Sequence, residues 1–106
     1  MPTKSKSPII TEAGIPAPRR NREPMHPGTH LRSILAETEG MTQEKLAREL
    51  RVSFQTVNLI INGKRAVTAD VALRLAKRFA TSPLLWLNMQ NAVDLWKAEQ
   101  DQAAHA

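Results

Sequence analysis

The sequence predicts an all-α fold, a five-helix bundle in a single domain. From residue 27 onward the apolar residues recur with a helical period, and no segment alternates in the way that a half-buried strand would. Ser or Thr stands before four of the periodic segments, where a hydroxyl group can cap a helix. Of the 106 residues, 42% are hydrophobic, which is enough for one modest core.

Residues 1–24 differ in composition from the rest of the chain. They hold five of the seven prolines, with Ser, Thr and Lys between them and no apolar periodicity. Such a segment buries too little apolar surface to offset the entropy of ordering it. We therefore expect a disordered N-terminal tail over residues 1–24 and a folded domain over residues 25–106.

The first helix is expected to begin at Pro27, because proline suits the first helical turn. Gly40 is expected to cap its C-terminal end. The residues expected on its apolar face are Leu31, Ile34, Leu35 and Thr38.

Two short helices should follow in close succession. Thr42 is the expected N-cap of a helix over residues 43–50, and Ser53 is the expected N-cap of the next helix. Asn62 and Gly63 end that helix. The residues expected to hold this pair against the core are Leu46, Leu50, Val52, Val57 and Ile60, with small Ala47 at the crossing.

Two more helices complete the bundle. Thr68 is the expected cap of a helix in which Val71, Leu75 and Phe79 repeat every four residues. Ser82 and the proline after it open a fifth helix, which should run to about residue 102.

The second and third helices have the spacing of a helix-turn-helix, in which the second helix of the pair enters the major groove of DNA. Gln and Asn can donate and accept together, which matches the edge of adenine, and an exposed Phe can touch a thymine methyl group. The residues expected to read bases at the start of the third helix are Ser53, Phe54, Gln55 and Asn58. The alternative for Phe54 is a buried position in the core.

Polar and basic residues flank these candidates. Backbone N–H groups at a helix N-terminus favour anions, and basic side chains in a loop suit phosphate contact. The residues expected to contact DNA phosphates are Thr42, Gln43, Arg51, Asn62, Lys64 and Arg65.

The charge distribution favours the same surface. The chain carries a net charge of +5, and residues 45–78 alone carry +6 whereas residues 79–106 carry −2. A basic centre beside a mildly acidic end is typical of a protein with one face for a polyanion. A solvated basic surface without a ligand is the alternative.

The fifth helix carries more apolar surface than one short domain can bury. Its stripe of Trp86, Met89, Val93 and Trp96 is expected to pack inside the domain. The remaining leucines then predict a homodimer interface made of Leu84, Leu85, Leu87 and Leu95.

Other classes of protein are disfavoured. No apolar run is long enough to span a membrane or to form a signal peptide, and the absence of cysteine fits a reducing cytoplasm. His26 and His30 lack further ligands, so neither a metal nor another cofactor is expected. Thr42 and Ser53 are better explained as caps than as nucleophiles, so no enzymatic activity is expected.

Residues 42–64 resemble the helix-turn-helix of phage repressors (the XRE/Cro type), and residues 25–100 resemble, more narrowly, the HigA-type antitoxins. The residues that carry the narrower resemblance are Met25-His26-Pro27-Gly28, Thr42-Gln43-Glu44, Leu46-Ala47, Val52-Ser53, Gln55-Thr56, Asn62-Gly63-Lys64-Arg65, Ala72-Leu73-Arg74-Leu75, Trp86-Leu87-Asn88-Met89-Gln90 and Asp94-Leu95-Trp96. The resemblance departs at Arg51, where the turn often has glycine, and residues 1–24 extend beyond the usual start of the family.

The resemblance implies a homodimer that binds double-stranded operator DNA at an inverted repeat, represses its own operon and binds a HigB-like RNase toxin. Two alternatives stay open. One is a stand-alone transcriptional regulator without a toxin partner, and the other is an adaptor bundle that uses its basic face on RNA or acidic proteins. The cluster of Ser53, Gln55 and Asn58 at the start of a recognition helix disfavours the adaptor.

Overall fold

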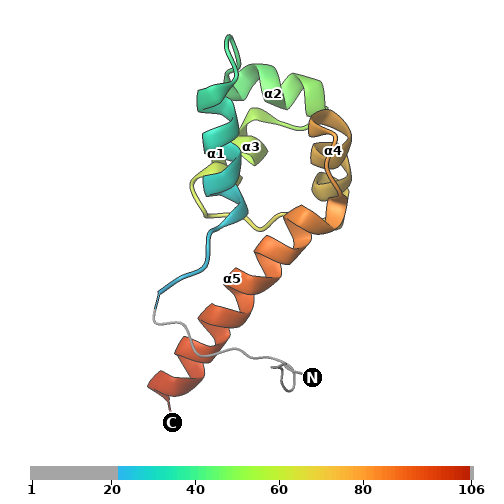
Figure 1. Ribbon diagram of the computed structural model, residues 1–106. Coiled ribbons are helices and arrows are strands. Elements are labelled where there is room, and N and C mark those ends of the chain that lie inside the picture. The colour runs from blue at the N-terminus through green and yellow to red at the C-terminus, as the bar shows by residue number, and fades with distance from the viewer. Residues whose placement is uncertain (1–21, 106) are drawn as a thin grey trace, which may run out of the picture.

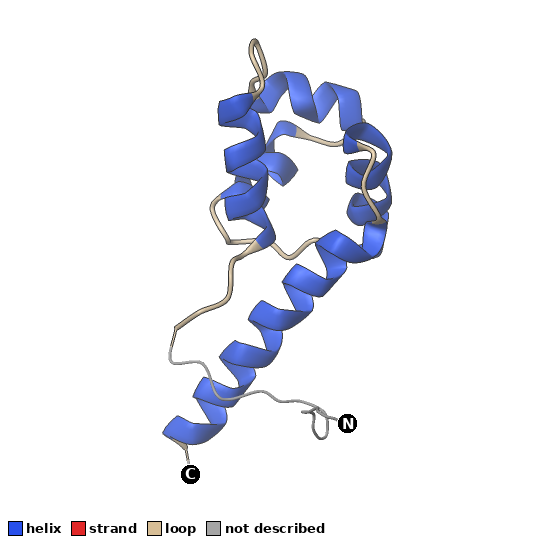
Figure 2. Ribbon diagram, viewed as in Figure 1, coloured by secondary structure: helices blue, strands red, loops and turns tan. Residues whose placement is uncertain are grey.

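The computed structural model describes residues 22–105, and within this range it contains five helices and no strand (Figures 1 and 2). The helices are α1 (Pro27–Glu37), α2 (Gln43–Leu50), α3 (Phe54–Ile61), α4 (Ala69–Phe79) and α5 (Pro83–Ala104). The predicted all-α class is confirmed. The expected tail over residues 1–24 lies outside the described residues except for 22–24, so its disorder stays a prediction.

Helices α1 to α4 surround the core, and α5 leaves this body as a long arm (Figure 1). Helix α3 packs against α1 and α2, and α4 packs against α2 and α5. The buried residues of α5 are Trp86, Gln90 and Val93, all in its first half. Every described side chain after Trp96 is exposed, so the second half of the arm contributes nothing to this core.

The core is built mainly from aliphatic side chains around one tryptophan. Trp86 is fully buried, and its indole Nε1 donates to the Thr81 hydroxyl at 2.9 Å. The ring centroid of His30 lies 5.3 Å from that of Trp86, and the ring centroid of Phe79 lies 6.3 Å away. The first turns of α1 and α5 are therefore fixed to each other through one side chain.

Four helices begin at the predicted N-caps. In each case a side-chain hydroxyl accepts from a backbone N–H of the first turn and so satisfies a donor that the helix leaves free. The capping residues are Thr42, Ser53, Thr68 and Ser82.

Helix α1 is capped by an imidazole instead of a hydroxyl. His26 stands just before the helix, and its Nδ1 accepts from the backbone N–H of Gly28 at 2.9 Å. Burial lowers the pKa of His26 below its ordinary value, and the positive charge of Lys97 lowers it further. The neutral form, the only one in which Nδ1 can accept, is thereby favoured.

The expectation that Gly40 caps α1 is wrong. Helix α1 ends at Glu37, with extended Thr38 as its C-cap, whereas Gly40 lies two residues further on with φ +77°. There the N–H of Met41 donates to the carbonyl of Thr38 at 3.1 Å, which closes a turn. The glycine serves this turn, which requires a positive φ, rather than the helix end.

One buried polar residue escapes the apolar pattern. Gln90 of α5 accepts from the backbone N–H of Val67 at 2.9 Å and donates to the Asp94 carboxylate at 3.0 Å. Gln90 therefore joins the segment between α3 and α4 to α5.

Among the described residues, no helix is long and apolar enough to cross a membrane.

Candidate nucleic-acid interface

Helices α2 and α3 are joined by a three-residue turn, residues 51–53, whose first residue is left-handed. Arg51 has φ +62° and ψ +44°. The N–H of Val52 donates to the carbonyl of Ala47 at 3.0 Å, and the N–H of Arg51 donates to the carbonyl of Arg48 at 3.2 Å. This pair of bonds is the Schellman motif, which ends a helix sharply and commonly uses glycine at the left-handed position.

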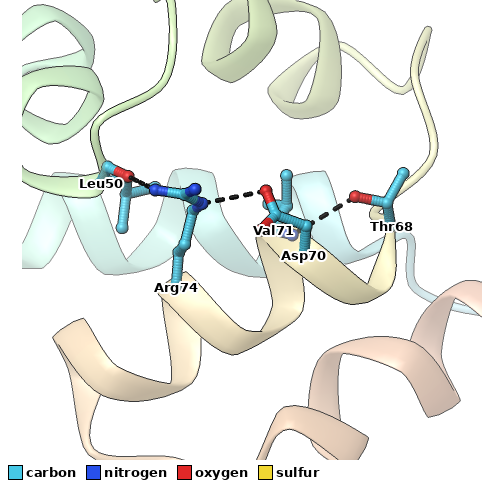
Figure 3. Close-up of polar contacts among 5 residues, drawn as sticks. All are labelled: Leu50, Thr68, Asp70, Val71 and Arg74. Atoms are coloured by element: carbon cyan, nitrogen blue, oxygen red, sulfur yellow. Dashed lines mark hydrogen bonds and ion pairs between the residues drawn. The ribbon is translucent and has the colours of Figure 1, made fainter.

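Helix α4 supports the C-terminal end of α2 through Arg74, which reaches the carbonyl of Leu50 (Figure 3). The Arg74 guanidinium donates through Nη1 to the carbonyl of Leu50 at 2.9 Å and pairs through Nε with Asp70 at 2.9 Å. Arg78 of the same helix forms an ion pair with Glu49. These contacts satisfy a free carbonyl at the negative end of α2 and hold the turn in place.

We expect Arg51→Gly to stabilise the domain by about 1 kcal/mol, because glycine adopts a positive φ without strain whereas arginine does not. The same change removes a basic side chain that was predicted to contact phosphate, so the expected contact with DNA should weaken. Urea denaturation measures the first effect, and fluorescence anisotropy with labelled DNA measures the second. A loss of stability in the glycine variant would contradict the strain at this position.

The base-reading candidates divide into two groups. Phe54 is 46% exposed, so its surface position is confirmed, and Gln55 beside it is also exposed. Ser53 is exposed too, but its hydroxyl accepts from the N–H of Thr56 at 3.0 Å as the cap of α3. Asn58 is half-buried, and its Nδ2 donates to Gln43 Oε1 at 2.9 Å. Phe54 and Gln55 are therefore the candidates whose side chains remain available.

The phosphate candidates lie on both sides of α3. Asn62, Lys64 and Arg65 are exposed in the segment that follows the helix, where the N–H of Lys64 donates to the carbonyl of Leu59 at 2.8 Å. Arg65 Nη1 donates to the Thr56 hydroxyl at 2.9 Å, which directs this guanidinium back toward the start of α3.

Thr42 and Gln43 stand at the N-terminus of α2. The Thr42 hydroxyl is used as the helix cap, accepting from the N–H of Lys45 at 3.1 Å, and the Gln43 side chain is half-buried.

Arg32 of α1 was not predicted to belong to this surface, yet its Nη2 donates to Asn62 Oδ1 at 3.0 Å. No pattern in the sequence marks this contact, because the two residues are 30 positions apart and meet only in the folded chain.

A second candidate surface lies on α5. Leu84, Leu85 and Leu95 are 61%, 38% and 65% exposed. Leu84 and Leu95 are eleven residues apart, which is about three helical turns, so they face the same side of α5. Leu87 belongs to the same predicted set, but it is partly buried and packs against the core of its own chain.

A helix-turn-helix held by α4, with exposed Gln55 on its second helix and exposed Lys64 and Arg65 in the segment that follows, defines a DNA-binding class of protein. The family described as "Helix-turn-helix" matches residues 31–86, and the chain belongs to this family. Antitoxin HigA-1 of Vibrio cholerae is 40% identical over 78 residues, which are 74% of this chain and 73% of the relative. The uncharacterized HTH-type transcriptional regulator YbaQ of Escherichia coli K12 is 40% identical over 80 residues, 76% of this chain and 71% of the relative.

A solved structure of the same kind contains DNA. The chain is similar to the Pseudomonas aeruginosa antitoxin HigA, whose structure was determined with the higBA promoter. The identity is 36% and the TM-score is 0.72, over 78% of this chain and 90% of the other.

Proposed function

We propose that this chain is a sequence-specific DNA-binding repressor and the antitoxin of a HigB/HigA-like module. It represses its own operon and neutralises an mRNA-cleaving toxin. The observation that carries the DNA-binding role is the exposed start of α3. The side chains of Phe54 and Gln55 are exposed there, and basic residues precede and follow the helix in the sequence. The likeness to a HigA antitoxin solved with its promoter supports the same role. Such a role consists of binding and requires no catalysis.

Within this proposal, Gln55 reads the edge of a base and Phe54 contacts a thymine methyl group. Lys64 and Arg65 hold phosphates next to the groove, and Arg51 and Gln43 hold phosphates on the other side of α3. The basic side chains provide the sequence-independent part of the affinity, and α3 provides the preference for one sequence.

The proposed repressor is a homodimer that binds an inverted repeat. The exposed Leu84, Leu85 and Leu95 of α5 support this assembly, since leucines gathered on one helix gain free energy when a second copy covers them. Two-fold symmetry in the protein then requires two symmetric half-sites in the DNA. The operator and the toxin both lie in the bacterial cytoplasm, and so we place the protein there.

Gln55→Ala and Lys64→Ala test the two kinds of DNA contact. Loss of Gln55 should cost about 1–3 kcal/mol and relax the preference at one base position. Loss of Lys64 should weaken binding to all sequences alike and reduce the salt slope by about one unit. Both side chains are exposed, so neither change should disturb the fold. Anisotropy titrations against single-base variants of the operator measure both effects, and an unchanged preference in Gln55→Ala would contradict the placement of α3 in the groove.

A stand-alone transcriptional regulator is the second candidate, because YbaQ, a relative of equal identity, is named as a transcriptional regulator only. Both candidates use the same DNA surface, so DNA binding cannot separate them. Co-expression with the protein encoded by the adjoining gene can. An antitoxin should restore growth when the neighbouring protein is toxic on its own, whereas a stand-alone regulator should have no effect.

A further inference from the structure

A chain of hydrogen bonds crosses the DNA-facing side of the fold from α1 to α2. Arg32 Nη2 of α1 donates to Asn62 Oδ1 at 3.0 Å. Asn62 Nδ2 donates to the carbonyl of Asn58 at 2.9 Å and lies 3.4 Å from Asn58 Oδ1. Asn58 Nδ2 donates to Gln43 Oε1 at 2.9 Å. We name these four residues the amide chain.

The guanidinium sets the direction of every bond in the amide chain. Arginine has only donors, so the oxygen of Asn62 must face Arg32 and its NH2 group must face Asn58. The oxygen of Asn58 then faces Asn62, and its NH2 group faces Gln43. Each amide has one oxygen and one NH2 group, so this orientation passes from Asn62 to Asn58 through the 3.4 Å contact between their side chains and from Asn58 to Gln43 through the 2.9 Å bond.

The last member of the amide chain is left with a free donor. Because Gln43 Oε1 accepts from Asn58, its Nε2 points away from the chain. Within residues 22–105 this Nε2 has no hydrogen-bond partner, and the Gln43 side chain is only half-buried. A donor at the N-terminus of α2 suits an anionic oxygen, whereas an amide oxygen there would repel it.

We propose that Arg32 is a positioning residue that orients the Gln43 amide to donate to a DNA phosphate. This inference rests on the proposed DNA-binding function. Asn58, which was predicted to read a base, transmits the orientation instead. Arg32 acts through its donor groups, and Gln43 makes the contact.

A double-mutant cycle tests the coupling. Arg32→Met removes the donor, and Arg32→Lys retains one; each is combined with Gln43→Ala. Arg32→Met should weaken operator binding about tenfold in the wild-type background and less than about twofold beside Gln43→Ala. Arg32→Lys should recover part of the loss. The salt slope should stay unchanged, because a direct Arg–phosphate contact would lower it by about one unit. Equal losses in both backgrounds, or a reduced slope, would overturn the proposal.

A measurement on the free protein separates this inference from the proposed function. In Arg32→Met the side-chain NH2 resonances of Asn58 and Gln43 should shift in the NMR spectrum, while the melting temperature stays near that of the wild type. Unchanged resonances would overturn the inference whatever the protein binds. If the resonances shift but the protein shows no preference for an operator, the amide chain exists as described. Its role toward phosphate and the proposed function would then both be overturned.

Discussion

Gly28→Ala is expected to destabilise the domain by about 3 kcal/mol or more, at the upper end of the usual cost of overpacking. An alanine Cβ at this position would lie 1.9 Å from the carbonyl oxygen of Ile60 and 2.8 Å from its carbonyl carbon. Both are backbone atoms, so no side-chain rotation can relieve the contact. Helix α1 would have to move away from the end of α3, against which it packs.

Gly40→Ala is the matched control, since it adds the same methyl group to another glycine of the same domain. Gly40 has φ +77° and open space around it, so only backbone strain opposes the change. We expect a cost of about 1 kcal/mol there. Urea denaturation of both variants gives the comparison. If the two variants lose equal stability, the close approach of α1 to α3 is not what requires glycine at position 28.

The double variant Leu84→Asp with Leu95→Asp is expected to abolish the dimer and to weaken operator binding about 100-fold or more. Linking two binding modules makes the second contact intramolecular, which raises the overall affinity by about 10² to 10⁴. Two carboxylates on the same side of α5 would face those of the partner copy and would require burial without a counter-charge. Because both leucines are more than half exposed in the single chain, the fold itself should persist. Light scattering after size exclusion measures the mass, and anisotropy measures the affinity.

Leu73→Asp provides the control for that experiment. Leu73 lies on α4 and is 59% exposed, which is close to the exposure of Leu84. It lies beside Arg74, Lys77 and Arg78 in a groove at the end of α2, and no residue of α5 lines this groove. This variant should remain dimeric. A monomeric Leu73→Asp, or a dimeric double variant, would place the interface elsewhere on the molecule.

Local signals in the sequence were sufficient to predict most of the helices. Caps such as Thr42 and Ser53 act within one turn of chain, so their residue types can be recognised without knowledge of the fold. The helix-turn-helix follows from two such caps and the apolar spacing between them. Phe54 and Gln55 are exposed as predicted, because the positions that face outward on an amphipathic helix follow from its period.

The rest depends on contacts between residues that are distant in the chain. In the sequence, Gln90 looks like any other polar residue of α5, and only the fold brings the N–H of Val67 to its side chain. The sequence predicts Asn58 as an exposed amide of the recognition helix, but its side chain donates a hydrogen bond to Gln43, 15 residues earlier. The crowding at Gly28 likewise depends on where α3 ends in space. Single-sequence periodicity contains no information on such pairs.

Footprinting on the DNA upstream of the protein's own gene tests the central claim most directly. The claim is that α3 reads one operator sequence in each of two symmetric half-sites. At physiological salt the protein should protect an inverted repeat whose half-site centres lie about 34–36 Å apart, one turn of DNA. It should bind this repeat at least about 10³-fold more tightly than a scrambled duplex. Equal affinity for both duplexes, or protection of a single unrepeated half-site, would contradict the account.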